Sequence, residues 1–584
     1  MPALPSTPAR LTSPATAKLP RIVLLIVGVV YILAGLFFRD PWKTDDVAGL
    51  ASMLAIVDGW QPGHWLLPAP APAADVIPLP GPLASWAGAL SIYVLGPLFS
   101  LFAGPLDGAI IASRIPNLLW FALMCLSVWY GSYLLGRRPE AQPLALPFGG
   151  EPGAPDYGRM IADAALLLIV ATVGIIWRMH ETSGVPALIA FQALAFYSVA
   201  RMLDRPAWGA FTLGLALAAS FLARGPMGAM PVFLGTLLCW RPGTGLWARR
   251  YWLTAALALA ATLVLSWWWA AWQATPASAI LWWQDQLTGL RVFNPANLAG
   301  VLRDLPWFLW PTWPFALLAL WRWRQWLHAP HIWVPAMFAL MPLLGMFVRD
   351  SVFEPEYSLL AVPCAVLASF ALPTLRRGVV NSLDWFAVMC FTLTCATVWL
   401  GWVALHTGWP AQIARNIARQ TAGYEPALSW IPVSIAAVGT LLWLALVRWR
   451  LVSRPAALWR GTVLSAGGLI ATWLLLATLW MPVLDYVRSY RQVSAELKQV
   501  LLARGDVPCV GMLDVGQGQR ASFLVFDGIR LSNQAGCPLV LQQTSPAAVR
   551  GGRVTTPPGS DVIWQGKRRP DRHEMFRLLQ AGEH

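Results

Sequence analysis

Long apolar runs make up most of this chain, and they constrain its fold more than any other feature. A membrane-spanning helix needs about 20 consecutive apolar residues, and thirteen runs of roughly that length are present. They cover residues 22–38, 113–136, 160–177, 183–200, 207–223, 225–240, 251–273, 305–321, 332–348, 358–375, 384–405, 430–447 and 463–482. Only 12% of the 584 residues are charged, whereas soluble domains carry about 25%. The sequence therefore predicts a polytopic α-helical membrane protein with about thirteen transmembrane helices, and it excludes an ordinary soluble enzyme.

The charges between the runs support this division and give it an orientation, because short cytoplasmic loops are enriched in Lys and Arg. If the N-terminus lies inside, the cytoplasmic loops contain Arg137, Arg138, Arg201, Arg205, Arg241, Arg249, Arg250, Arg322, Arg324, Arg376, Arg377, Arg448, Arg450, Arg454 and Arg460. Most acidic residues then fall in the outer loops. We therefore expect residues 1–21 to be a cytoplasmic lead-in, residues 22–484 to form the membrane domain, and residues 485–584 to lie outside.

The first outer loop, residues 39–113, is long enough to contain helices of its own. Its segment 84–104 is apolar enough to span, but counting it as a span would invert every later loop. We expect it to lie at the outer membrane surface, and an additional span stays open as the alternative. Thr44, Asp45 and Asp46 precede apolar residues with helical spacing, which predicts an interfacial amphipathic helix. Residues 61–82 form a proline-rich stretch.

The tail differs in composition from the rest of the chain. A helical stretch over Tyr490–Ala503 is followed by short apolar segments at 508–513 and 522–526, bounded by Gly and Asp. This pattern predicts a small α/β domain. Cys509 and Cys537 are the only two cysteines outside the apolar runs. Because the predicted outer compartment is oxidising, we expect a disulfide that closes a loop of about 27 residues.

Ionisable residues gather at the predicted outer ends of the spans. A charge within the bilayer is costly and usually functional, and the runs have essentially none at mid-depth. The outer groups are Asp45 and Asp46 in the amphipathic helix, Arg178, His180 and Glu181 in one tight turn, Arg224 in another, and Asp285 and Arg291 in a third loop. This distribution favours a site at the outer membrane–water boundary over an ion-coupled transport path.

These residue types suit group transfer from a phosphate ester. A carboxylate can deprotonate the nucleophile while arginines hold the phosphate of the leaving group. We assign catalysis to Asp45, Asp46 and Glu181, with Asp45 favoured as the base, and donor-phosphate binding to Arg224 and Arg178. The candidates for substrate binding are His180, Asp285, Arg291 and Tyr357.

Each assignment also has a plainer interpretation. The Asp pair would favour any helix N-terminus, and interfacial arginines extend towards headgroups without binding substrate. His180 and Tyr357 would serve as turn and interface residues, and Asp285 with Arg291 as a solvated pair. A divalent metal stays open, but the ligand spacing does not support one, so no cofactor is assigned.

In these motifs the chain resembles the GT-C superfamily of membrane glycosyltransferases. It is most similar to the branch that contains aminoarabinose (lipid A) transferases and protein O-mannosyltransferases. The matching segments are Asp45-Asp46, Asp58 to Pro62, Arg114 to Pro116, Gly136 to Arg138, His180-Glu181 and Arg224 to Pro226. A proline motif of the family is matched only in part, by Leu79 to Trp86, where its Glu and Lys are missing.

The resemblance implies an inverting transferase in the bacterial inner membrane, with its C-terminal domain in the periplasm. The implied donor is a polyprenyl-phosphate sugar, and the implied acceptor is a lipid, a glycan or a protein. Membrane lipids are further expected partners, and no nucleic-acid partner is expected. The family's base is an acidic residue of the first outer loop. Two alternatives stay open, a transporter or flippase of lipid-linked sugars and a non-catalytic envelope assembly protein. The sequence specifies neither sugar nor acceptor.

Overall fold

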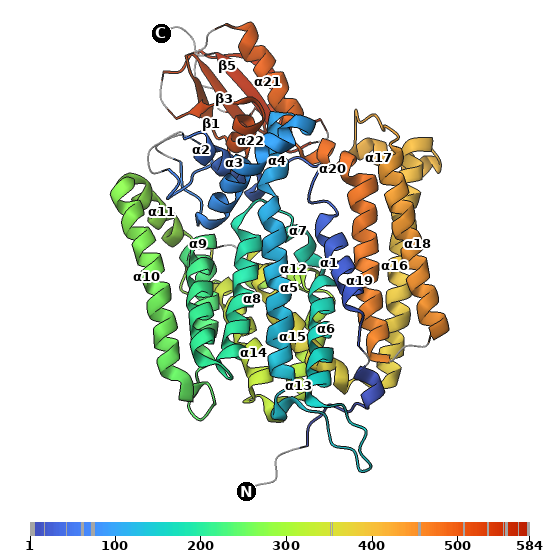
Figure 1. Cartoon of the computed structure of the whole chain (residues 1–584). Coiled ribbons are helices and arrows are strands. Elements are labelled where there is room, and N and C mark those ends of the chain that lie inside the picture. The colour runs from blue at the N-terminus through green and yellow to red at the C-terminus, as the bar shows by residue number, and fades with distance from the viewer. Residues whose placement is uncertain are drawn as a thin grey trace.

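The computed structural model describes residues 6–580, apart from positions 17, 43, 60–63, 72–75, 351, 353, 454–456, 506–507, 534–535, 553, 555–558 and 570. Trp60 and Pro62 of the family motif, and parts of the proline-rich stretch, therefore lie outside the described residues. The helices form an upright bundle with a five-stranded sheet at one end (Figure 1). The expected fold class, a polytopic helical protein with a small C-terminal α/β domain, is confirmed.

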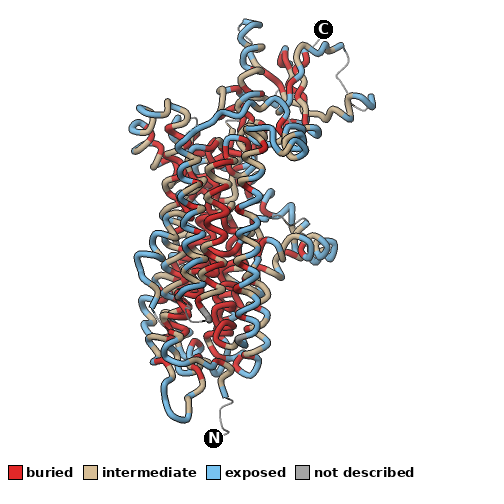
Figure 2. Tube along the Cα trace, turned by 90° about the vertical axis from the view of Figure 1, so that its right-hand side faces the viewer, coloured by how far each residue is buried: buried red, intermediate tan, exposed pale blue. Residues whose placement is uncertain are grey.

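The bundle has a buried centre and an apolar exterior. Its helices are α1 (Arg21–Leu33), α5 (Ile115–Gly136), α6 (Ala154–Val170), α8 (Gly184–Met202), α9 (Pro206–Leu238), α10 (Arg250–Ala274), α13 (Thr312–Arg322), α14 (Pro330–Gly345), α15 (Glu354–Ala371), α16 (Arg377–Thr407), α18 (Trp430–Ser453) and α19 (Ala457–Leu475). Almost every residue of α15 is buried, and buried residues run along the middle of the bundle (Figure 2). Large apolar side chains such as Leu265 and Trp269 are exposed on the outside. Such a surface suits lipid rather than water.

By length and composition, ten helical segments of the described residues could cross a membrane. One of them, α9, contains two of the predicted runs, and its backbone is non-helical at Arg224 and Gly225. A straight helix of 33 residues would be about 50 Å long. However, the chain segments on either side of α9 lie close together: a Cβ added to Gly245, which follows α9, would lie 3.5 Å from Cδ2 of Leu203, which precedes α9. The chain therefore reverses at Arg224–Gly225, as the sequence suggested.

The expectation of one helix over residues 305–321 is wrong. Two shorter helices, α12 (Asn297–Phe308) and α13, are separated by residues 309–311. Pro311 has no amide hydrogen and cannot continue the hydrogen-bond ladder of a helix. The run 160–177 is also divided, because α6 ends at Val170 and α7 (Val173–Arg178) begins after Thr172. The number of spans remains a prediction.

Three helices of the long first loop form a layer between the bundle and the sheet: α2 (Asp45–Val57), α3 (Leu83–Ala103) and α4 (Pro105–Ser113) (Figure 1). The chain reverses between α3 and α4, where Ser91 Oγ donates a hydrogen bond to the carbonyl of Ala112 at 2.6 Å. By length and composition α3 could also cross a membrane, so the placement of residues 84–104 at the membrane surface stays a prediction.

Helix α2 is not the interfacial helix that the sequence predicted, because most of its residues are buried. Its apolar side chains pack against α3 and against Ala521 and Val525 of the C-terminal domain. A Cβ on Gly49 would lie 1.7 Å from the carbonyl oxygen of Thr182. Only glycine at this position allows α2 to lie so close to the turn before α8.

The C-terminal domain is a mixed sheet with helices packed on it. Its elements are α21 (Arg491–Ala503), β1 (Val510–Leu513), α22 (Gln517–Asp527), β2 (Leu531–Ser532), β3 (Leu539–Thr544), α23 (Pro546–Arg550), β4 (Asp561–Gly566) and β5 (Met575–Gln580). The strand order is β2-β1-β3-β5-β4, with β1 parallel to both neighbours and β5 antiparallel to both of its own. Segment 508–513 contains β1, whereas segment 522–526 lies in α22.

Contacts from the C-terminal part of the chain fix the first loop. Helix α20 (Met481–Arg488) leads into the domain, and Asp485 Oδ1 accepts a hydrogen bond from Trp42 Nε1 at 2.7 Å. Arg491, at the start of α21, forms ion pairs with Asp40 at 2.6 Å and Asp107 at 2.5 Å. The first loop and the C-terminal domain are thus one packed unit.

A disulfide joins Cys509 to Cys537, with 5.3 Å between their Cα atoms. This is the pairing that the sequence suggested. Replacing Cys509 with Ser should lower the stability of the domain by about 3 kcal/mol, because the unfolded chain regains the freedom of the closed loop. Hydrogen exchange in β1 and β3 of the full chain would measure the change. A Cys390→Ser variant is the control, since Cys390 is unpaired. Unchanged exchange in Cys509→Ser would contradict the prediction.

Candidate functional site

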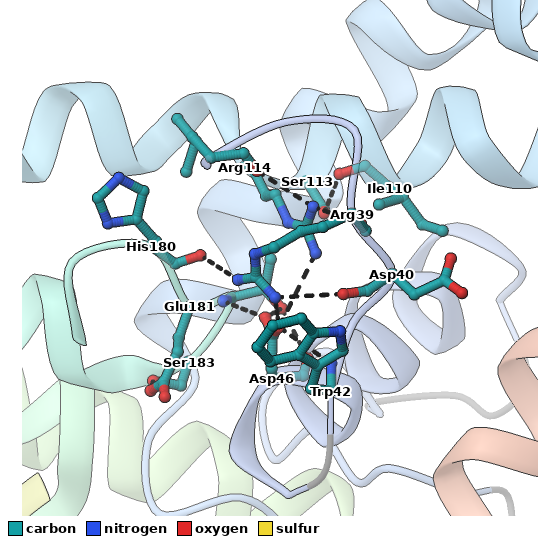
Figure 3. Close-up of polar contacts among 12 residues, drawn as sticks. Arg39, Asp40, Trp42, Asp46, Ile110, Ser113, Arg114, His180, Glu181 and Ser183 are labelled. Atoms are coloured by element: carbon teal, nitrogen blue, oxygen red, sulfur yellow. Dashed lines mark hydrogen bonds and ion pairs between the residues drawn. The ribbon is translucent and has the colours of Figure 1, made fainter. Parts of the chain in front are cut away.

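Asp46 is the buried centre of a polar cluster at the sheet-domain end of the bundle (Figure 3). Its Oδ2 accepts hydrogen bonds from Arg39 Nη1 at 2.7 Å and from the backbone N–H of Trp42 at 3.1 Å. Its Oδ1 accepts bonds from the backbone N–H and the hydroxyl of Thr182, both at 2.8 Å. Burial raises the pKa of Asp46, but Arg39, Arg114 and Thr182 outweigh it and hold the pKa at about 2. Asp46 is therefore ionised and fully bonded, which suits an anchor better than a base.

Two arginines that the sequence did not single out as site residues complete this cluster. Arg114 Nη2 lies 3.8 Å from Asp46 Oδ2, and its Nη1 donates to the carbonyl of Arg39 at 2.7 Å. Arg39 Nη2 donates to the carbonyl of His180 at 2.7 Å. Both side chains are fully buried. Their position at the ends of apolar runs was the available signal, but such arginines usually extend to the membrane surface instead.

Asp45, one residue before Asp46, faces the open side of the site. Its side chain is 38% exposed, against 5% for Asp46. Its Oδ2 lies 3.4 Å from Arg224 Nη1, which comes from the reversal in α9. Successive residues of a helix point about 100° apart, so one carboxylate can be anchored while its neighbour stays accessible. The site thus has an accessible carboxylate beside a guanidinium.

Glu181 lies in the turn between α7 and α8 and is almost completely buried. Its Oε1 accepts a bond from Arg178 Nη1 at 2.7 Å, and Arg178 also pairs with Glu354. Burial, together with Asp46 and Asp45, raises the pKa of Glu181 to about 7, although Arg178 opposes the shift. Arg178 is therefore already shared between two carboxylates, and its predicted role at the donor phosphate gains no support from this geometry.

The raised pKa of Glu181 gives a stability prediction. The folded protein binds a proton at this carboxyl up to a pH of about 7, whereas the unfolded chain releases it near 4.5. The stability that this proton contributes is thus complete below 4.5 and lost as pH rises towards 7. Glu181→Gln mimics the protonated form at every pH. The melting temperature of this variant minus that of the native protein should therefore increase as the pH rises from 4.5 to 7. Exposed Glu425→Gln is the control, and parallel pH profiles for the native protein and Glu181→Gln would contradict the prediction.

Arg224 lies at the junction of two cavities. A cavity of about 160 Å³ is lined by Arg224, Met227 and Arg349 together with Pro80, Asp285, Gln286 and Gly289. A second cavity of about 400 Å³ shares Arg224, Met227 and Arg349 and extends between α9, α14 and α15, where most of its lining is apolar. Arg349 Nη1 also pairs with Glu356 Oε1 at 3.0 Å. The sequence did not identify Arg349, because Arg224, with which it lines both cavities, lies far away in the chain. We call the larger cavity with this opening the apolar channel; its mouth has the guanidinium groups of Arg224 and Arg349, and Asp285 and Glu356 also belong to the lining of the two cavities.

Of the other candidate residues, Asp285 lines the cavity at Arg224, whereas His180, Tyr357 and Arg291 line neither of the two cavities. The ring of His180 is fully buried 5.4 Å from that of Trp473, and burial lowers its pKa to about 4. Tyr357 is buried with its ring 5.8 Å from that of Phe308. Arg291 pairs with Asp350 at the surface. Within the described part of the chain, no group of three or more His, Cys, Asp or Glu residues could hold a metal ion.

Comparison with known proteins identifies the fold. No protein-family model and no curated protein sequence matches this chain. Its structure is similar to that of ArnT from Cupriavidus metallidurans in the apo state, with a TM-score of 0.62, 14% sequence identity, and coverage of 95% of this chain and 97% of that chain. For ArnT from the same organism bound to undecaprenyl phosphate, the TM-score is 0.61 and the identity 13%, with the same coverage. The likeness extends over bundle and sheet domain alike, and it confirms the fold expected from the sequence motifs.

Proposed function

We propose that this protein is an inverting membrane glycosyltransferase that takes a sugar from a polyprenyl-phosphate donor. The observation that carries the proposal is the apolar channel whose cationic mouth, at Arg224 and Arg349, lies beside the accessible carboxylate of Asp45. A protein of similar fold binds undecaprenyl phosphate, which is consistent with this class of donor. We place the site at the periplasmic face of a bacterial inner membrane, with the N-terminus in the cytoplasm, as the loop charges indicate.

The channel suits the two parts of such a donor. An isoprenoid chain needs apolar walls, and Pro231, Leu234 and Leu359 are among the residues that provide them. A phosphate needs donors in a planar fork, which guanidinium groups supply. Arg224 and Arg349 stand where the apolar part of the channel ends, so the phosphate would lie between them and the sugar would extend towards Asp45.

The same geometry allows a single displacement. Asp45 takes the proton of an acceptor hydroxyl while that oxygen attacks the anomeric carbon. The bond between the anomeric carbon and the phosphate oxygen breaks on the opposite face, and polyprenyl phosphate leaves with its charge held by Arg224 and Arg349. One displacement inverts the anomeric centre. Asp46 holds the start of α2 in position, and Glu181 is the second carboxylate near the acceptor.

Arg224 provides the test of donor binding. Arg224→Ala should lower kcat/KM for the donor about 10- to 100-fold, because a hydrogen bond to a charged group contributes roughly 1.5–3 kcal/mol. Arg224→Lys should lose less, since it keeps the charge without the fork. The measurement is release of polyprenyl phosphate from a panel of polyprenyl-phosphate sugars by protein in vesicles.

Arg303→Ala is the matched control, because Arg303 is an exposed arginine that pairs only with its neighbour Asp304 among the described residues. Unchanged donor kinetics in Arg224→Ala would remove Arg224 from the phosphate site. Movement of the intact lipid-linked sugar across the vesicle membrane, with no sugar transferred, would favour the transporter alternative. The absence of both activities would favour an assembly role.

A further inference from the structure

A second cationic cavity lies at the sheet-domain end of the molecule, away from the channel described above. Its volume is about 710 Å³, and three segments form it: α17 (Ala411–Gln420), the end of α20, and the connection between β4 and β5. The lining residues are Asn416, Arg419, Gln420, Val487, Arg488, Arg568, Asp571 and Arg572. It shares no lining residue with the two cavities at Arg224.

Positive charge in this cavity is only partly neutralised by the protein. The single lining carboxylate, Asp571, pairs with Arg568, which also pairs with Glu574 at 3.5 Å. Among the described residues, no carboxylate lies within ion-pair distance of Arg419, Arg488 or Arg572. Burial, followed by the charges of Arg568 and Arg39, lowers the pKa of Arg488, although Glu354 opposes the shift. Several guanidinium groups around one cavity leave it strongly attractive to an anion.

The cavity lies at the end of the bundle at which the long apolar helix α16 ends, and we place the lipid headgroups at this end. Helix α17 follows the long apolar helix α16 and lies at the same end of the bundle as the sheet (Figure 1). It has Ile413 and Ile417 on one side and Arg415 and Arg419 on another, the pattern of a helix in the interface plane. Phosphate groups of membrane lipids are concentrated at this depth.

Contacts of Arg488 connect the cavity with the candidate active site. Its guanidinium lies 5.0 Å from the centre of the Trp42 ring and 5.7 Å from that of Trp177. The two rings stack with 4.6 Å between their centres, and Arg39 lies 5.2 Å from each of them. The stacked rings of Trp42 and Trp177 would thus lie between an anion bound at Arg488 and the cluster around Asp46.

We propose that this cavity, lined by Arg419, Arg488, Arg568 and Arg572, is a second anion site that binds a phosphate ester at the membrane surface. None of its lining residues lines the donor channel, and the anion would bind whether or not the proposed transfer reaction takes place. Guanidinium groups from three separate segments surround the cavity, so they can contact a phosphate from several sides. The ligand chemistry is that of a phosphomonoester, either on a lipid headgroup or as the free anion.

The test uses the full chain in nanodiscs of zwitterionic lipid, with native mass spectrometry to count bound phosphatidate. The variant is Arg419→Gln with Arg572→Gln, since both side chains are exposed. The control is Arg415→Gln with Arg550→Gln, two exposed arginines outside the cavity. We expect the first pair to weaken phosphatidate binding about tenfold or more, which corresponds to 1.4 kcal/mol, and the control to leave it unchanged.

Inorganic phosphate separates the two sources of the ligand. If millimolar phosphate displaces phosphatidate from the native protein, the free anion is sufficient. If it does not, while the first variant still loses phosphatidate, the headgroup on its lipid is the ligand. Equal binding by the variant and the control would overturn the proposal, whatever the transfer assay shows.

Discussion

Replacing Asp45 with Asn should lower the rate of sugar transfer by about 10²–10⁴-fold, the usual contribution of a general base. Asparagine has nearly the same shape and still accepts a hydrogen bond from Arg224, but it cannot take a proton from the acceptor hydroxyl. Because the Asp45 side chain is 38% exposed, the fold should tolerate the change. The measurement is the initial rate of polyprenyl phosphate release, with the melting temperature recorded on the same preparation.

Asp58→Asn is the matched control for this variant. Asp58 is an exposed aspartate at the other end of α2, so its replacement tests whether any change of charge on this helix reduces transfer. We expect transfer close to the native rate. Native rates in both variants would place the base elsewhere, and a lowered melting temperature in Asp45→Asn would assign the carboxylate to the fold.

Asp46→Asn should have its main effect on stability. The change leaves Arg39 and Arg114 buried without a full counter-charge, and breaking a buried ion pair in this way costs about 3–5 kcal/mol. Unfolding of the detergent-solubilised protein would show the loss as a lower melting temperature. Asp304→Asn is the control, because the pair of Asp304 with Arg303 lies at the surface, where such pairs contribute about 0–1 kcal/mol.

The two aspartates are adjacent, yet the expected results differ in kind. Asp45→Asn should be stable and slow, whereas Asp46→Asn should be unstable first and inactive as a consequence. A stable Asp46→Asn protein without transfer activity would contradict this division and would make Asp46 the base. The difference follows from their surroundings: Arg39, Arg114 and Thr182 enclose Asp46, whereas the side chain of Asp45 is 38% exposed.

The sequence predicted the features that depend on local pattern. Apolar length and loop charge gave the bundle, and the change of composition near residue 485 gave the sheet domain. The reversal at Arg224 was predictable because Gly225 and Pro226 follow it. The disulfide was predictable because only two cysteines lie outside the apolar runs.

What the sequence could not predict depends on contacts between distant segments. Arg178 is one turn of chain from Glu181, but its second partner, Glu354, is 176 residues away. Arg349 likewise lines the same cavity as Arg224, although the two residues are far apart in the sequence. The burial of α2 was hidden too, because its spacing of apolar residues is compatible with a membrane surface. Part of its cover comes from α22 of the distant C-terminal domain, which local spacing does not reveal.

The contacts of Arg491 with the first loop have a consequence for biosynthesis. Arg491 bonds to Asp40 and Asp107, which are 451 and 384 residues earlier in the chain. The helix that carries Asp45 therefore leaves the ribosome early, but it gains the part of its cover that α22 provides only when residues 481–527 have been made and packed. A chain that stalls in translation before α20 would expose the apolar side of α2. Cellular proteases could then recognise such stalled copies at the segment that carries Asp45 and Asp46.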